Sequence, residues 1–187
     1  MIELFESDAR VPDRHSSKGN QLKWEKDGFW YKADYTGYEA LAEFVVSRLL
    51  EYSGLSPKEY VRYEIVEVQY KGQRFRTARS RNMLTEDWQI ITLERLFRNR
   101  FGHSLHTAIW QMQDESDWLK FLCEQTERIT GIESFGTYLA KLLTIDAFFK
   151  NEDRHTHNIA VLMNGKGEFQ LCPVFDNGAS LLPDPVA

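Results

Sequence analysis

The sequence is poor in cysteine and has no long apolar run, and each of these absences excludes a class of protein. Its 187 residues include two cysteines, Cys123 and Cys172, which lie far apart in apolar surroundings. A disulfide scaffold needs more cysteines than this, and a zinc site usually needs paired ligands. We therefore expect both thiols to be reduced and to lie in or near a core.

Segments that target or anchor a chain are missing as well. The N-terminus, MIELFESDARVPDR, lacks a basic region followed by an apolar run, so it does not resemble a signal peptide. No apolar stretch approaches the length of about 18 residues that a membrane span needs. We expect a cytoplasmic protein with no membrane partner.

A surplus of positive charge is also absent. The formal net charge is -5, which gives no general attraction to nucleic acids or anionic membranes. Basic residues gather at Arg74, Arg76, Arg79 and Arg81, where their spacing predicts one solvated face of a strand. We therefore expect no direct nucleic-acid partner.

What the sequence does have is the composition of a globular domain. Its 42% apolar and 27% charged residues are typical values, and a chain of this length can enclose a substantial core. The first part is rich in predicted strands and the second in predicted helices. This order favours an α+β fold with two lobes in one domain, an N-lobe over residues 1–82 and a C-lobe over residues 83–187.

Two hairpins and one helix make up the predicted N-lobe. Asp27-Gly28 and Lys71-Gly72 are the turns of the hairpins. Between the hairpins, Thr36 and Glu39 fit a capping box at the start of a helix that should end near Gly54. The predicted strands are Asn20–Glu25, Phe29–Ala33, Tyr60–Tyr70 and Gln73–Ser80.

The predicted C-lobe begins with three helices and ends with a polar loop and a short hairpin. Apolar residues recur at three- and four-residue spacing in the helices, and Gly131 separates the last two. The elements are helices Asp87–Arg100, Asp114–Thr130 and Ile132–Phe149, a loop Lys150–His157, and strands Ile159–Met163 and Glu168–Pro173.

Charged and amide side chains occur in the order that phosphoryl transfer from ATP requires. That reaction needs a cation on the phosphates, oxygen ligands for magnesium, and a carboxylate that orients the attacking hydroxyl. Kinases supply a strand lysine, a helix glutamate, an Asp-to-Asn loop and a later magnesium-binding Asp. The matching residues here are Lys32, Glu43, Asp153, Asn158 and Asp176.

The spacing of these residues assigns them roles. Asp153 and Asn158 are five residues apart, as the base and the metal-binding Asn are in a kinase catalytic loop. We expect Asp153 to accept the proton of the substrate hydroxyl. Asn158 and Asp176 would offer the hard oxygen ligands that Mg²⁺ favours.

Lys32 lies in an apolar strand and needs a partner on the helix that follows. Glu39 and Glu43 are one turn apart, and both are candidates. Glu39 is already explained by the capping box, whereas a carboxylate in the middle of an apolar helix needs a partner. We therefore predict a Lys32–Glu43 pair with both residues in the catalytic site.

Four short motifs are spread over the region from Ser16 to Ser180. They are Gly19-Asn20-Gln21-Leu22-Lys23, Glu43 with Gly54 eleven residues later, Asn151-Glu152-Asp153-Arg154-His155-Thr156-His157-Asn158, and Pro173-Val174-Phe175-Asp176. Together they resemble the motifs of the HipA-like serine/threonine kinases. The Asp153–Asn158 core also looks like the catalytic loop of phosphoinositide lipid kinases.

The resemblance implies a bilobal protein-kinase-like fold, with a shortened C-lobe because few residues follow Asp176. It implies ATP and Mg²⁺ as cofactors and a protein substrate with a Ser or Thr acceptor, the chain's own included. It also implies an antitoxin-like partner. The residues implied to contact the nucleotide are Gly19, Gln21, Lys23, Lys32, Ser80, Arg81, Asn82, His155, Asn158 and Asp176.

Two other hypotheses stay open. The chain could bind nucleotide without transferring phosphate and act as a regulatory module. Asp153, His155 and His157 alternate, which would suit a metal-dependent hydrolase if the segment were extended, although no fourth ligand is evident. Taken alone, Asp153 and Asn158 could also simply cap turns.

Overall fold

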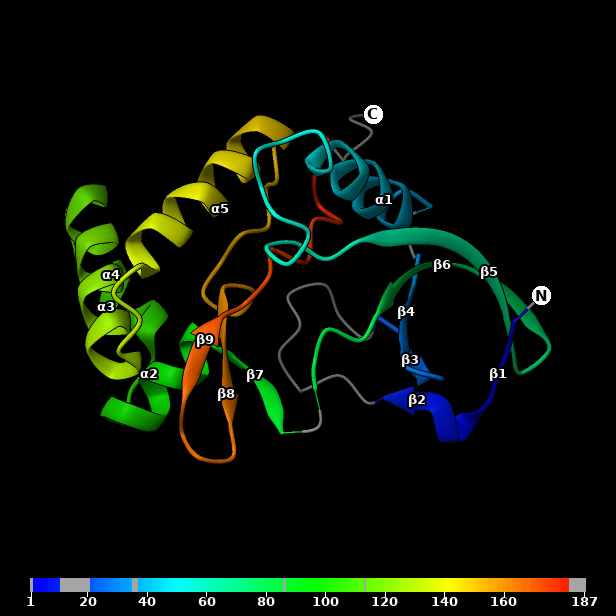
Figure 1. Cartoon of the computed structure of the whole chain (residues 1–187), viewed down its shortest axis with the longest axis horizontal. Helices are drawn as coiled ribbons and strands as arrows, with labels where there is room; N and C mark the ends of the chain where they lie inside the picture. Colours follow the sequence, from blue (N-terminus) through cyan, green and yellow to red (C-terminus); the bar gives the residue numbers. More distant parts are fainter. Residues whose placement is uncertain (1, 11–20, 35–36, 86, 113, 182–187) are drawn as a thin grey trace. The chain divides into compact units, whose positions relative to one another are not determined.

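The computed structural model describes residues 2–10, 21–34, 37–85, 87–112 and 114–181, and the chain forms two compact units (Figure 1). Unit 1 is made of Met1–Met83, Phe149–Asp153 and Pro173–Ala187. Unit 2 is made of Leu84–Phe148 and Arg154–Cys172. The predicted limits of the two lobes, 1–82 and 83–187, stay a prediction.

A six-stranded sheet with the strand order β1-β5-β6-β4-β3-β2 forms most of unit 1. The pair β1 and β5 is parallel, and the other neighbouring strands are antiparallel. The elements are β1 (Ile2–Leu4), the 3-10 helix η1 (Glu6–Asp8), β2 (Ala9–Arg10), β3 (Lys23–Lys26), β4 (Phe29–Ala33), β5 (Tyr63–Tyr70) and β6 (Gln73–Arg81).

Both predicted hairpins are present, β3–β4 and β5–β6. Asp27 and Gly28 have φ values of 52° and 76°, and Lys71 and Gly72 have 49° and 77°. Two consecutive positive φ values give the turn whose twist matches that of the flanking strands, and glycine adopts them without strain. The two turn dipeptides therefore set the register of both hairpins.

The two faces of the sheet have different surroundings, because side chains alternate along each strand. One face holds a buried core with Trp24 at its centre, and the other carries Lys32 and Ala78, which are cross-strand partners. The core cluster consists of Leu4, Trp24, Tyr31, Ala33 and Val68.

The four arginines of β6 do not share one face, so that prediction is wrong. Arg74 and Arg76 lie on the face of Ala78, whereas the odd step from residue 76 to residue 79 moves Arg79 and Arg81 to the other face. There the guanidinium groups of Arg79 and Arg81 lie 4.9 and 5.9 Å from the centroid of the Phe29 ring.

Helix α1 (Glu39–Leu50) packs on β5 and β6 and buries Ala40, which shares a core cluster with Tyr63 and Ala78. The predicted capping box is wrong, since Glu39 is the first helical residue and its N–H donates to Asp34 Oδ1 at 3.2 Å. Thr36 lies outside the described residues.

The end of α1 also differs from the prediction. Glu51 is the C-cap, and its N–H donates to the carbonyl oxygens of Arg48 and Leu49. Tyr52 N and Ser53 N then donate to the carbonyls of Leu49 and Leu50, at 3.0 and 3.1 Å. These bonds satisfy the last carbonyls, so Gly54 is not the residue that ends the helix.

Unit 2 combines a three-stranded sheet, order β7-β8-β9, with helices. The helices and strands are β7 (Trp88–Thr92), α2 (Leu93–Phe101), α3 (Leu105–Trp110), α4 (Glu115–Thr130), α5 (Phe135–Phe149), β8 (Ala160–Asn164) and β9 (Phe169–Leu171), with the last residue of α5 counted in unit 1. Helix α3 has no counterpart in the prediction.

The predicted helix Asp87–Arg100 is wrong over its first part, where β7 pairs antiparallel with β8. Two isoleucines and a threonine end this strand, and β-branched residues fit a pleated sheet well. Thr92 then caps α2, because its side-chain oxygen accepts the N–H of Arg95 at 3.2 Å.

Both cysteines are free, with Cys172 buried and Cys123 half-buried, as expected. Burial raises the pKa of the Cys172 thiol to about 12. Within the part of the chain that the structure describes, no helix is both long enough and apolar enough to cross a membrane.

Candidate active site

Unit 1 encloses a pocket against the lysine-bearing face of its sheet. Six residues predicted for the site meet there: Gln21, Lys23, Lys32, Glu43, Asp153 and Asp176. The wall is completed by Ala33, Glu39, Ala40, Ala78, Gly178 and Ala179. Strands β3, β4 and β6, helix α1 and two segments from late in the chain thus contribute to one pocket.

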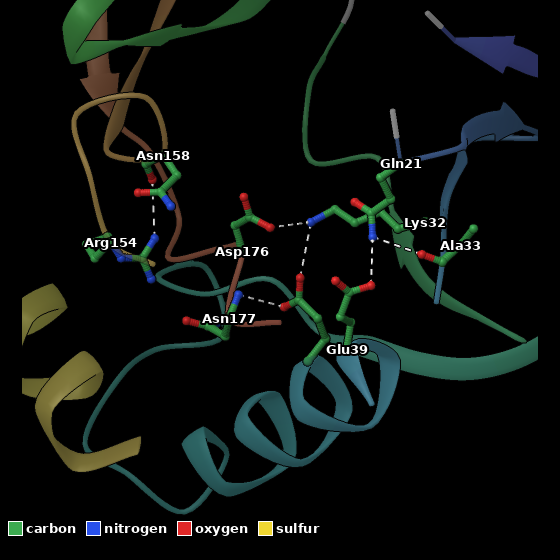
Figure 2. Close-up of polar contacts among 9 residues, drawn as sticks. Gln21, Lys32, Ala33, Glu39, Arg154, Asn158, Asp176 and Asn177 are labelled. Atoms are coloured by element: carbon green, nitrogen blue, oxygen red, sulfur yellow. Dashed lines mark hydrogen bonds and ion pairs between the residues drawn. The ribbon is translucent and has the colours of Figure 1, made fainter. Parts of the chain in front are cut away.

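Lys32 lies between two carboxylates at the centre of this pocket (Figure 2). Its Nζ is 3.1 Å from Glu43 Oε1 and 3.0 Å from Asp176 Oδ1. The Glu43 side chain is 3% exposed, whereas that of Asp176 is 43% exposed. One partner is therefore fully inside the fold, and the other reaches the solvent.

The pKa values in this cluster follow from burial and charge. Burial lowers the pKa of Lys32, but Asp176 and Glu43 outweigh burial and raise it well above its ordinary value. Burial raises the pKa of Glu43, and the positive charge of Lys32 only partly opposes this. Lys32 is therefore a permanent cation, and Glu43 is the group that the fold must hold ionised.

The segment after Asp176 helps to hold Glu43. The backbone N–H of Asn177 donates to Glu43 Oε2 at 2.9 Å, and Figure 2 shows this bond beside the Lys32 contact. Asp176 has a φ of 62°, a conformation that Asp tolerates better than most residues. A Cβ on Gly178 would lie 3.5 Å from Glu39 Cβ, an ordinary van der Waals distance, so this segment runs alongside the start of α1.

Asp153 reaches the same pocket from the loop after α5. Its N–H donates to Asn151 Oδ1 at 3.2 Å, which forms a local turn. The loop is joined to the last described segment, since Glu152 N donates to Ala179 O at 3.4 Å and Leu181 N to Phe149 O at 2.7 Å. The carboxylates of Asp153 and Asp176 thus line one pocket with Lys32.

Glu39 is a pocket residue that sequence reasoning assigned to a cap. Gln21 Nε2 donates to Ala33 O at 2.9 Å and to Glu39 Oε2 at 3.4 Å, so Gln21 links β4 to the start of α1. The available signal was the position of Glu39 one turn before Glu43 on the same helix.

Lys23 lies directly opposite Lys32 in the β3–β4 register. Burial lowers the pKa of Lys23, and the positive charge of Lys32 lowers it further. No described residue forms an ion pair with Lys23. The pocket therefore contains a second ammonium group that has no carboxylate partner within the described chain.

The predicted residues of unit 2 lie in a polar turn. Asn158 is buried, and its Oδ1 accepts the N–H of His155 at 2.8 Å. Arg154 Nη1 donates to Asn158 O at 3.3 Å (Figure 2). The Nε and Nη2 of Arg154 form a buried bidentate pair with Asp146 at 2.8 and 2.9 Å. This pair fixes the turn from inside unit 2.

The same segment bears on the hydrolase hypothesis. Residues 156–158 form a turn, so the segment is not the extended strand that alternating metal ligands would need. His157 N donates to His155 Nδ1 at 3.1 Å, a local contact within the turn. Among the described residues, no cluster of three or more acidic, histidine or cysteine side chains could hold a metal ion.

The remaining predicted residues lie outside the pocket wall or outside the described chain. Ser80 and Arg81 end β6, and Asn82 follows them. Asn82 N donates to Gly28 O at 2.8 Å, and its Nδ2 donates to Glu25 Oε1 at 3.0 Å. Gly19 lies outside the described residues, and its role stays a prediction.

Comparison with solved structures identifies the type of fold. No protein-family model matches the chain, and no curated protein matches it significantly. Among solved structures, the chain is similar to the Helicobacter pylori proinflammatory kinase CtkA, with a TM-score of 0.66 and 16% sequence identity. The similarity covers 97% of this chain and 62% of that kinase.

The chain therefore has a kinase-like α+β fold with a shortened helical part. Proteins of this fold in general use ATP and a metal ion. The likeness to HipA-like kinases stays a prediction.

Proposed function

We propose that the pocket of unit 1 binds Mg-ATP and that the protein transfers the γ-phosphoryl group to a Ser or Thr hydroxyl of a protein, its own chain included. The observation that carries this proposal is the position of Lys32. It is fixed by Glu43 and Asp176 in the pocket that Asp153 also lines.

The charges of the pocket suit a phosphate ligand. Lys32 is a permanent cation. Its two carboxylate partners would have different roles, because Glu43 is buried and Asp176 is partly exposed. Glu43 would hold the ammonium group in place, and the more exposed Asp176 would offer a carboxylate oxygen to a metal ion. Mg²⁺, when bound, would neutralise charge on the phosphates.

The metal ligands are assigned by their donor chemistry. Asp176 offers a carboxylate that is 43% exposed, a hard oxygen donor at the pocket. Asn158 is assigned as a further ligand from its place in the sequence pattern, and its amide oxygen is a hard donor of the kind that Mg²⁺ binds.

Asp153 is assigned as the base. The substrate hydroxyl oxygen would form a bond to the γ-phosphorus while the bond from that phosphorus to the bridging oxygen breaks, and ADP leaves with the electron pair. Asp153 would orient the hydroxyl and take its proton. The proton thus ends on a carboxylate that lines the pocket with Lys32.

Magnesium-dependent binding of ATP is the direct test. ATP with Mg²⁺ should raise the free energy of unfolding, by about 2.7 kcal/mol when ATP is at 100 times its dissociation constant. Asp176→Asn keeps the shape of the side chain and should raise the Kd of Mg-ATP about tenfold or more, equivalent to about 1.4 kcal/mol. Thermal shift and calorimetric titration would measure both effects.

The matched control is Asp27→Asn, because Asp27 also has a positive φ and is an exposed carboxylate of a turn in unit 1. It should bind Mg-ATP as the wild type does. Stabilisation by ATP that is equal with and without Mg²⁺ would contradict the metal assignment. No stabilisation at any concentration would contradict nucleotide binding.

A nucleotide-binding module without transferase activity is the second candidate, acting as a regulator with an antitoxin-like partner in a toxin–antitoxin system. It is favoured by one observation, that the contacts which fix Lys32, Glu43 and Asp176 do not involve Asp153, the residue assigned to transfer. Transfer of radiolabel from ATP to protein separates the two candidates, since only the kinase labels protein.

A further inference from the structure

Three cations lie side by side on the pocket face of the sheet. Arg10 on β2 is the cross-strand partner of Lys23 on β3, and Lys23 is the partner of Lys32 on β4. Directly paired residues point to the same face of a sheet. The neighbours Ala9 and Trp24 pair with each other and pack in the core on the other face, which confirms the direction of the row.

Such a row is unfavourable without a compensating anion, because like charges directly opposite each other destabilise a sheet. Lys32 is compensated by two carboxylates. Lys23 has no ion pair with any described residue. Arg10 has one, since its Nε is 3.2 Å from Glu25 Oε2, and its side chain is 46% exposed.

The guanidinium of Arg10 has donors to spare. Its Nε donates to Glu25 and its Nη1 donates to Ser7 O at 3.2 Å, while the described residues provide no acceptor for Nη2. Glu25 is held independently, because its other oxygen accepts a bond from Asn82 Nδ2 at 3.0 Å. Arg10 can therefore exchange Glu25 for a ligand without leaving that carboxylate unpaired.

We propose that Arg10 and Lys23 form an outer anion subsite beside Lys32, which binds the phosphate chain of a nucleoside triphosphate and makes affinity depend on the number of phosphates. This rests on the proposed nucleotide binding in the same pocket. Adjacent strands are about 4.8 Å apart, so the row extends about 10 Å from Lys32 to Arg10, which suits a chain of phosphates better than a single one.

Calorimetric titration with ATP, ADP and AMP, each with Mg²⁺, tests the subsite. The wild type should bind ATP more tightly than ADP and ADP more tightly than AMP. Arg10→Gln and Lys23→Gln should each raise the Kd for ATP about tenfold, because each removes one charge-assisted contact. The ratio of the affinities for ATP and AMP should become smaller in both variants. Arg74→Gln is the control, because it removes an exposed cation from the same face of the sheet. It should leave the Kd values for all three nucleotides unchanged.

Glu25→Gln gives a test with the opposite sign. It removes the carboxylate that competes for Arg10, so ATP should bind more tightly, by a few-fold, and the gain should vanish in the double variant with Arg10→Gln. Inorganic tripolyphosphate has the phosphate chain but no nucleoside, and it should compete with ATP for the wild-type protein. This test needs no variant, so it holds even if a substitution prevents folding.

The outcomes separate the two proposals. If the wild type binds none of the nucleotides, the proposed function fails. If the wild type binds Mg-ATP but Arg10→Gln and Lys23→Gln bind it within twofold of the wild type, the outer subsite is overturned and the function stands. Tripolyphosphate that fails to compete with bound ATP would also overturn the subsite.

Discussion

Replacing Asp153 by asparagine should reduce phosphoryl transfer by about 10² to 10⁴-fold, the range that a positioned general base contributes. The substitution keeps the size of the side chain and its place in the pocket wall, but an amide cannot take the proton of the substrate hydroxyl. Transfer of radiolabel from ATP to protein, measured at saturating Mg-ATP, would show the loss.

Binding should be spared in the same variant. Lys32 and its two carboxylates do not depend on Asp153 for their contacts, so the Kd for Mg-ATP should stay within a few-fold of the wild type. Glu152→Gln is the matched control, because Glu152 is the adjacent exposed carboxylate, and it should transfer phosphate normally. Unchanged transfer in Asp153→Asn would show that another group is the base.

The part of the site that could be predicted from the sequence is the part with a local physical reason. A lysine in the apolar strand 29–33 and a glutamate within an apolar helix each need a partner, and the structure pairs Lys32 with Glu43. The loop and the later Asp followed from the order in which kinases supply their polar groups. The structure places Asp153 and Asp176 in the same pocket wall.

What the sequence could not predict depends on contacts between distant segments. Strand β2 has two residues, too few to show periodicity, so the pairing of Arg10 with Lys23 has no local signal. Glu39 had a sufficient local explanation as a capping residue, which was wrong because Asp34 receives its N–H. Arg10 was thus missed for lack of a local signal, and Glu39 because a local explanation already accounted for it.

The fold shows the same division. The β3–β4 and β5–β6 hairpins follow from turn dipeptides within the chain, and both were predicted. The sequence wrongly predicts the start of a helix where β7 lies, because a short run of apolar residues fits either element. This segment forms a strand because it pairs with β8, which lies far along the chain, and such a pairing gives no local signal.

The contacts around Lys32 link catalysis to stability. The buried Glu43 accepts bonds from Lys32 Nζ and Asn177 N, so the strand, the helix and the segment after Asp176 are held by one carboxylate. Because burial raises the pKa of Glu43, the ionised form that positions Lys32 is also the form that costs the fold most. Substituting Lys32 should therefore lower both the rate of phosphoryl transfer and the free energy of unfolding.

Lys32→Met should reduce phosphoryl transfer by about 10³-fold, since it removes a charged contact to the phosphates from a partly buried pocket. Methionine fills the volume of the stem but leaves Glu43 without its cation. Breaking a buried ion pair costs about 3–5 kcal/mol, and we expect about 3 kcal/mol here because Asn177 N remains and Glu43 can take up a proton. Chemical denaturation would measure the free energy of unfolding.

The pH dependence of this variant identifies the cause. Without Lys32, the pKa of Glu43 in the folded protein should rise further above its ordinary value of 4.5. A folded-state pKa above the unfolded one gives stability that is present at low pH and is lost as the pH rises through the folded value. The free energy of unfolding of Lys32→Met should therefore fall, relative to the wild type, as the pH rises from 4.5 towards neutrality. The double variant Lys32→Met/Glu43→Gln lacks the titrating group and should lose this slope, whereas a slope that persists in the double variant would assign it to a carboxylate other than Glu43.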